Sequence, residues 1–117
     1  MPFAEPRPNR RHFVAFKEQL PFSISPKRKE LNIAVTSLTL SNQSFTAKFV
    51  KVVSRGGDGD VDLMEVLMGP TQAMHLPFPH PMMVGENRKL VIIDQVPDGA
   101  LFPTTVVGYQ WKASDDM

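Results

Sequence analysis

Apolar residues along the chain occur in short runs with a period near two, which is the spacing of side chains on one face of a β-strand. Val, Ile, Thr and Phe dominate these runs, and helical periodicity is weak. The predicted strands cover residues 12–16, 20–24, 31–40, 44–53, 61–68, 89–96 and 104–111. Clusters of turn-forming residues separate them. This spacing predicts an all-β antiparallel sandwich, of jelly-roll or related type.

Two of the predicted strands change phase part-way along. In residues 31–40 the alternation of apolar residues is regular as far as Val35 and resumes one residue out of step at Leu38. A similar slip falls within residues 44–53. A slip of one residue would turn the rest of a strand to the wrong face unless a β-bulge absorbs it. We therefore expect bulges in both strands.

Prolines divide the chain. There are 11 of them, about twice the usual share, and each fixes φ and removes a backbone donor. Residues 1–11 are rich in Pro and Arg and are expected to form an extended arm. Residues 69–82, GPTQAMHLPFPHPM, are expected to form a long exposed loop. The predicted organisation is this arm followed by a single β domain over residues 12–117.

Composition narrows the possible function classes. The chain has no cysteine, which excludes disulfides and thiol catalysis. No apolar run approaches the ~20 residues of a membrane-spanning helix. The first residues lack the apolar stretch of a secretory signal. We expect synthesis in the cytoplasm.

Charge is distributed unevenly. The net charge of +1 is not that of a dedicated nucleic-acid-binding protein. Residues 1–30 hold seven Lys or Arg against three Glu, whereas residues 31–117 hold six against nine Asp or Glu. A basic N-terminal segment followed by an acidic remainder favours contacts between copies of the chain, or with an acidic partner.

The arm and the proline-rich segment supply the candidate partner-binding residues. These are Arg7, Arg10, Arg11, Leu76, Phe78, Met82 and Met83. We expect the arm to contact protein rather than nucleic acid, because it holds only three arginines and few aromatic residues. A solvated tail is the alternative for the arm. For the proline-rich segment, the alternative is that its Phe and Met side chains complete the core.

The stretch RGGDGDVD, residues 55–62, raises the question of a metal site. Carboxylates occupy alternate positions, at Asp58, Asp60 and Asp62. An EF-hand loop would then need Gly at its sixth position and Glu at its twelfth, and these are Leu63 and Gly69. Gly and Asp are also the residues that a tight hairpin requires. We predict a turn between two strands and no metal site.

Catalytic and cofactor motifs are lacking. His75 and His80 are five residues apart, but no further ligands have the spacing of a zinc site. No nucleophile–base arrangement is recognisable. The glycines of residues 56–59 lack the lysine and following helix of a phosphate-binding loop. We expect a protein that is not an enzyme and has no cofactor.

Two hypotheses about function remain. The first is a structural or interaction protein, a small capsid, cement or decoration subunit of a viral or phage-like assembly that forms an oligomer, in which case its final location is the virion. The second is a small β-sandwich module that binds carbohydrate or nucleic acid. Tyr109 and Trp111, the only Tyr and Trp of the chain, are its candidate ligand-binding residues, because aromatic rings two apart on one strand face can stack on sugars or bases. A core or interface position is the alternative for both rings.

Overall fold

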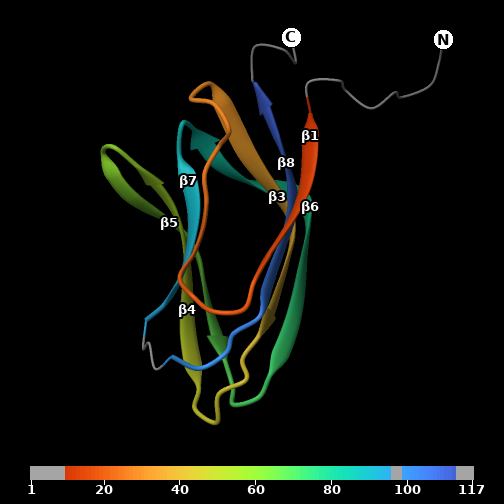
Figure 1. Ribbon diagram of the computed structural model, residues 1–117, viewed down its shortest axis with the longest axis vertical. Helices are drawn as coiled ribbons and strands as arrows, with labels where there is room; N and C mark the ends of the chain where they lie inside the picture. Colours follow the sequence, from red (N-terminus) through yellow and green to blue (C-terminus); the bar gives the residue numbers. More distant parts are fainter. Residues whose placement is uncertain (1–9, 96–98, 113–117) are drawn as a thin grey trace, which may run out of the picture.

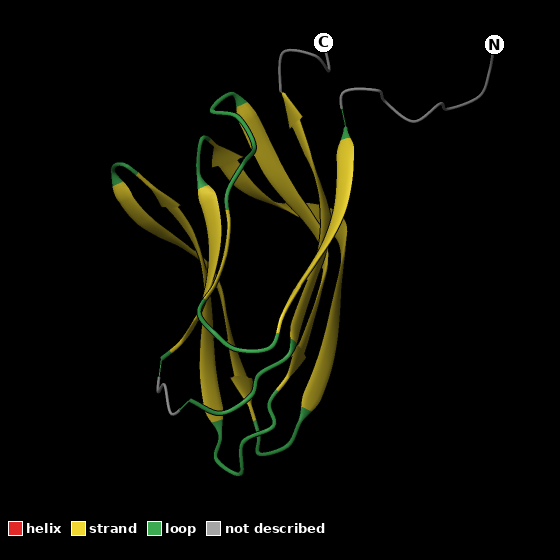
Figure 2. Cartoon of the chain, in the orientation of Figure 1, coloured by secondary structure: helices red, strands yellow, loops and turns green. Residues whose placement is uncertain are grey.

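The computed structural model describes residues 10–95 and 99–112. Within these ranges there are eight strands and no helix, so no helix there could cross a membrane (Figure 2). The strands are β1 (Arg11–Lys17), β2 (Phe22–Ile24), β3 (Leu31–Ser41), β4 (Lys48–Gly56), β5 (Gly59–Met68), β6 (Ala73–Glu86), β7 (Lys89–Asp94) and β8 (Thr104–Lys112). The all-β prediction is confirmed.

The strands form two antiparallel sheets that face one another (Figure 1). Sheet A has the order β1-β8-β3-β6, and sheet B has the order β2-β7-β4-β5. Strand β1 pairs with β8, β2 with β7, β3 with β6 and β4 with β5. The chain is therefore one long hairpin wound around itself, which is the arrangement of an eight-stranded jelly roll.

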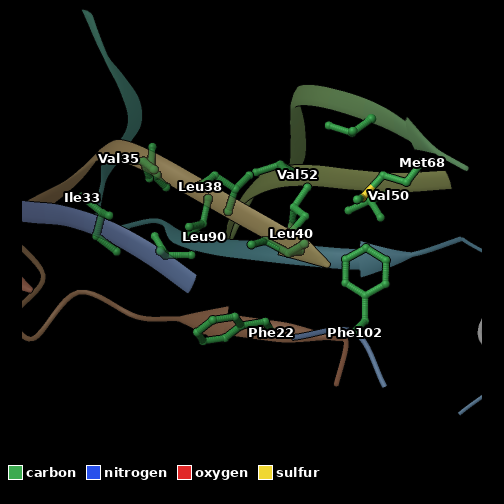
Figure 3. Close-up of a cluster of buried hydrophobic side chains, with 14 residues drawn as sticks. Phe22, Ile33, Val35, Leu38, Leu40, Val50, Val52, Met68, Leu90 and Phe102 are labelled. Carbon is green, nitrogen blue, oxygen red and sulfur yellow. The ribbon is translucent and has the colours of Figure 1, made fainter. Parts of the chain in front are cut away.

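The core lies between the inner faces of the two sheets (Figure 3). Its fully buried side chains come from alternate positions of the central strands, as the period of two predicts. They include Ile33, Val35, Leu38, Leu40, Val50, Val52, Leu90, Ile92 and Val106. Phe22 and Phe102 also pack into this cluster.

A bulge in β3 keeps the core pattern in phase. In the pairing of β3 with β8, Val35 is opposite Gly108 and Ser37 is opposite Val107, so Thr36 is the extra residue. The pairing of β3 with β6 is also irregular at this point. Thr36 Oγ1 donates a hydrogen bond to the carbonyl of Val107 at 3.0 Å. This confirms the slip predicted in residues 31–40. The bulge predicted in residues 44–53 is wrong, because β4 pairs with β7 without a register shift. The irregularity opposite Val52 and Val53 places the extra residue, Leu63, in β5.

The prediction of a loop over residues 69–82 is wrong, because most of that segment belongs to β6. Strand β6 is at the edge of sheet A, where a proline's missing donor can face away from the ladder. Pro77 is opposite Ser37 and Met82 is opposite Val35. The four residues between Pro77 and Met82 therefore lie opposite Thr36 alone, in a wide bulge that accommodates two more prolines.

The strand predicted at residue 44 begins four residues later, at Lys48. The buried side chain of Asn42 holds the preceding residues in a turn. It donates hydrogen bonds to the carbonyls of Thr46 and Gly69 at 3.0 and 2.9 Å, and its Oδ1 accepts one from the Ser44 amide at 3.0 Å. These bonds satisfy the backbone without a partner strand.

A buried ion pair lies at the start of β4. Lys48 Nζ is 2.9 Å from Asp94 Oδ2, with side-chain exposures of 2% and 10%. The pair joins the first residue of β4 to the last residue of β7. Removing either charge would leave the other buried without the opposite charge beside it, which is strongly unfavourable.

We predict that Gly108→Ala destabilises the fold by about 2–3 kcal/mol. A Cβ at this position of β8 would lie 2.2 Å from the carbonyl oxygen of Ala34, a backbone atom of the neighbouring strand beside the bulge. Urea unfolding measures the change. Gly57→Ala is the matched control, because a Cβ there meets nothing within 4 Å. Equal unfolding midpoints for the two variants would contradict this account.

We also predict that Lys48→Met destabilises the fold by about 3–5 kcal/mol, because it removes the buried positive charge that lies against Asp94. The double variant Lys48→Met, Asp94→Leu should recover most of that loss, since it removes both charges. Urea unfolding of the two single variants and the double variant forms a thermodynamic cycle. Additive losses would show that the two side chains do not depend on each other.

Candidate interaction surface

The outer face of sheet A is built from the residues that alternate with its core positions. Residues directly opposite in antiparallel strands lie on the same face. A row of Trp111, Asn32 and the exposed Glu86 lies at one end of this face, and three further rows cross the sheet beside it. The first row is His12, Tyr109, Ala34 and Met83. The second is Val14, Val107, Ser37 and Pro77. The third is Phe16, Thr105, Thr39 and His75.

These three rows contain no Asp, Glu, Lys or Arg, and several of their apolar side chains are open to solvent. Val14 is 71% exposed, Phe16 is 58% exposed and Met83 is 42% exposed. Aromatic residues and Met are enriched at the centres of protein interfaces, where charged residues are depleted. The composition of these three rows is therefore that of a contact surface rather than of an ordinary solvated sheet.

The outer face of sheet B differs in its charge. It also carries an exposed apolar pair, Phe49 opposite Leu67. The next outward residue of β4, however, is Lys51, whose Nζ lies 3.3 Å from Asp62 and 3.6 Å from Glu65. The hydrogen bond and charge of Asp62 raise the pKa of Lys51. Charged side chains thus interrupt the apolar surface of sheet B.

Of the predicted arm residues, Arg7 lies outside the described part of the chain. Arg11 begins β1. The guanidinium of Arg10 is 4.9 Å from the centre of the Tyr109 ring, a cation–π contact. The base of the arm is thereby attached to the outer face of sheet A. Partner binding by the arm stays a prediction.

The four candidate residues of the proline-rich segment separate into two groups. Leu76, Phe78 and Met82 are half-buried and pack against the core. Met83 points the other way and joins the outer face of sheet A. The structure therefore gives the first three a place in the interior and leaves Met83 accessible to a partner.

The aromatic pair of β8 is not an open stacking platform. Tyr109 is 8% exposed, because Arg10 lies over its ring and the His12 ring lies 5.5 Å from it at a tilt of 55°. Trp111 is half-buried, opposite Asn32. Ligand binding by Tyr109 and Trp111 stays a prediction.

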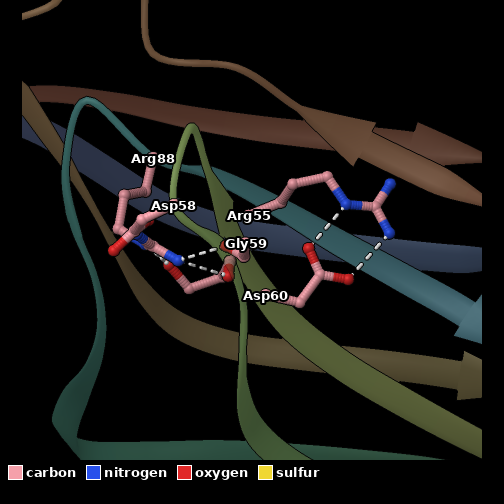
Figure 4. Close-up of polar contacts among 6 residues, drawn as sticks. Arg55, Asp58, Gly59, Asp60 and Arg88 are labelled. Atoms are coloured by element: carbon pink, nitrogen blue, oxygen red, sulfur yellow. Dashed lines mark hydrogen bonds and ion pairs between the residues drawn. The ribbon is translucent and has the colours of Figure 1, made fainter.

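The predicted turn at residues 55–62 is confirmed. Gly56 pairs with Gly59, so two residues connect β4 to β5. Each carboxylate of this stretch has a basic partner (Figure 4): Asp60 accepts two hydrogen bonds from Arg55 at 2.8 and 3.0 Å, and Asp58 accepts one from Arg88. Across the described residues, no three His, Cys, Asp or Glu gather closely enough to hold a metal ion.

Arg88 connects the β6–β7 turn to the β4–β5 hairpin through hydrogen bonds. It lies between β6 and β7, and its side chain is 16% exposed. The guanidinium donates to Ser54 Oγ at 2.6 Å, to the carbonyl of Ser54 at 2.9 Å and to the carbonyl of Gly59 at 2.7 Å, as well as to Asp58. The sequence offers no sign of this role, because Arg88 is 30 residues from Asp58.

Two of the surface residues could have been found from the sequence. Residues 12–16, HFVAF, have apolar side chains on both faces of the strand. Phe13 and Ala15 face the core, and Val14 and Phe16 face out. A strand with one face in solvent normally alternates with polar residues. An uninterrupted apolar strand is therefore a signal that both of its faces are covered.

Comparison with known proteins gives no family. No family model and no curated protein matches the chain. The crystal structure of PirA is similar over 90% of this chain and 96% of that chain, with a TM-score of 0.38 and 14% identity. The structure of infectious bursal disease virus, Gx strain, is similar over 97% of this chain but 42% of that chain, with a TM-score of 0.35 and 11% identity. Similarities this weak carry no functional argument.

We predict that Asp58 and Asp60 titrate below the ordinary carboxyl value. Hydrogen bonding to Arg88 lowers the pKa of Asp58 from 3.8, and hydrogen bonding to Arg55 lowers that of Asp60. Because both pKa values are lower in the folded chain than in the unfolded chain, these pairs stabilise the fold above about pH 4 and are lost as the pH falls further. Carboxyl-carbon NMR measures each titration.

Two arginine variants serve as controls for each other. Arg88→Gln should raise the midpoint of Asp58 more than that of Asp60, and Arg55→Gln should do the reverse. If either variant moved both carboxylates equally, the separate pairing of Arg88 with Asp58 and of Arg55 with Asp60 would be wrong.

Proposed function

We propose that this chain is a structural subunit of a protein assembly, of the capsid, cement or decoration type, and that it acts without catalysis. The observation that supports the proposal is the outer face of sheet A, with exposed Val14, Phe16 and Met83 and no Asp, Glu, Lys or Arg in the three rows that contain them. Copies of the chain meet through this face. In a viral assembly, its final location is the virion.

Of the four edge strands of the two sheets, β1 is the one least protected against pairing with another chain, so we expect copies to meet on the β1 side of this surface. Unpaired strand edges attract other chains, and proteins protect them with prolines, charges or short strands. Strand β6 has prolines at alternate positions, β5 has three carboxylates and β2 has three residues. Strand β1 has seven residues and no proline, and its two charged residues, Arg11 and Lys17, are at its ends.

In the assembly, apolar side chains would supply the binding affinity, and charged side chains would supply the orientation of the partners. Burying a Phe or Val side chain contributes roughly 1.5–3 kcal/mol, so Val14 and Phe16 supply affinity. The basic residues of the first part of the chain and the acidic residues of the remainder supply orientation and a faster encounter. Jelly rolls serve both viral capsids and lectins, so the surface and not the fold carries the proposal.

The alternative, a small β-sandwich module that binds carbohydrate or nucleic acid, has less support. It needs an accessible aromatic face. Tyr109 is covered by Arg10 and His12, which leaves only the half-buried Trp111.

Light scattering at low and moderate salt tests the proposal. We expect the native chain to form a closed oligomer, and Phe16→Glu to raise its dissociation constant at least about tenfold, because a charge would be desolvated in the contact. Phe45→Glu is the matched control, since Phe45 is 88% exposed in the loop before β4 and is not part of the three rows of sheet A.

Two results would contradict self-assembly through this face. One is a native chain that stays monomeric at every concentration. The other is equal dissociation by Phe16→Glu and Phe45→Glu. If Phe16→Glu does not fold, Val14→Ser replaces it, because Val14 is even more exposed and the change adds no charge.

A further inference from the structure

A cavity of about 610 Å³ opens at the end of the sandwich, away from the outer face of sheet A. Three segments far apart in the sequence line it: the β2–β3 loop, the β4–β5 hairpin and the β6–β7 turn. These segments lie at the upper end of the molecule in Figure 1. The volume falls within the range of small-molecule sites, and the cavity is open to solvent.

The lining is strongly basic. It contains Lys27, Arg28, Lys29, Arg55 and Lys89, and no Asp or Glu. Arg28 and Arg55 have carboxylate partners outside the lining, Glu30 at 3.4 Å and Asp60 at 2.8 Å. Within the described residues, the three lysines make no ion pair. Their charges are therefore available to a ligand.

The walls are held in place before any ligand arrives. The amide of Lys27 donates to Gln110 Oε1 of β8 at 2.9 Å, and the amide of Asn87 donates to the carbonyl of Leu31 at 3.3 Å. Arg88 holds the β4–β5 hairpin against the β6–β7 turn by donating hydrogen bonds to the carbonyls of Ser54 and Gly59. The backbone of the loops that carry the cations is thus held in place, which lowers the entropic cost of anion binding.

The space beside the hairpin is open. Gly57 lines the cavity, and a Cβ added there would meet nothing within 4 Å. A ligand could therefore approach the hairpin backbone closely, where peptide N–H groups are donors for anions.

We propose that this cavity binds a compact polyphosphate anion, a small molecule with several phosphate groups. Single phosphates would engage only part of the basic lining. Nucleic acid suits the site less well, because no aromatic residue lines the cavity to stack a base, and residues 31–117 are acidic overall. The proposal is independent of the assembly proposed above, since it uses different residues.

Isothermal titration of the full chain with inorganic tripolyphosphate tests this site, with sulfate at equal ionic strength as the comparison. We expect saturable one-to-one binding of tripolyphosphate, at least tenfold tighter than that of sulfate. Lys29→Gln and Lys89→Gln should each weaken it about tenfold, because each removes a charged hydrogen-bond donor from the anion.

Lys17→Gln is the matched control, because it removes the same charge from the far end of β1. The proposal is overturned if tripolyphosphate does not bind saturably, if sulfate binds equally well, or if Lys17→Gln weakens binding as much as Lys29→Gln does. A single-stranded oligonucleotide that binds more tightly than tripolyphosphate, with affinity rising with its length, would also overturn it in favour of nucleic acid. Circular dichroism confirms that each variant is folded.

Discussion

The bulge at Thr36 is the constraint on which the rest of the structure depends. Strand β3 is central in sheet A and pairs with both β8 and β6. In a regular strand without the bulge, Val35 and Leu38 are three positions apart and would face opposite sides, and half of the strand's apolar residues would leave the core. The bulge in turn requires β8 to approach closely, and Gly108 supplies the space because a side chain there would overlap Ala34. One glycine in β8 thus allows both halves of β3 to reach the interior.

Polar interactions fix the elements that the apolar core leaves undetermined. Hydrophobic burial is not directional, so it does not decide how the hairpin tip of β4–β5 sits against the β6–β7 turn. Arg88 determines this arrangement through several directed hydrogen bonds. At the other end of β4, the buried Lys48–Asp94 pair fixes the start of the strand against the end of β7. The two contacts hold β4 at both ends.

The sequence predicts most of the strands because alternation and turn residues are local properties. It indicates the bulge in β3 for the same reason. It misses β6, because prolines exclude a central strand and nothing local shows that this strand is at an edge. The basic run Lys27–Lys29 is visible in the sequence, but its meeting with Arg55 and Lys89 is not, since only the tertiary fold brings them together. The exposure of Val14 and Phe16 likewise depends on which strand borders β8.

The unequal protection of the sheet edges limits the geometry of any assembly. If β1 is the edge that accepts a neighbour, each molecule can extend its sheets by strand pairing with only one other molecule. Pairing of two such edges closes about a twofold axis and leaves no edge for a third molecule. The prolines of β6 therefore do more than accommodate a strand at the border of sheet A. They prevent the open-ended stacking of sheets that leads to fibres, and a larger shell must be completed by contacts of another kind.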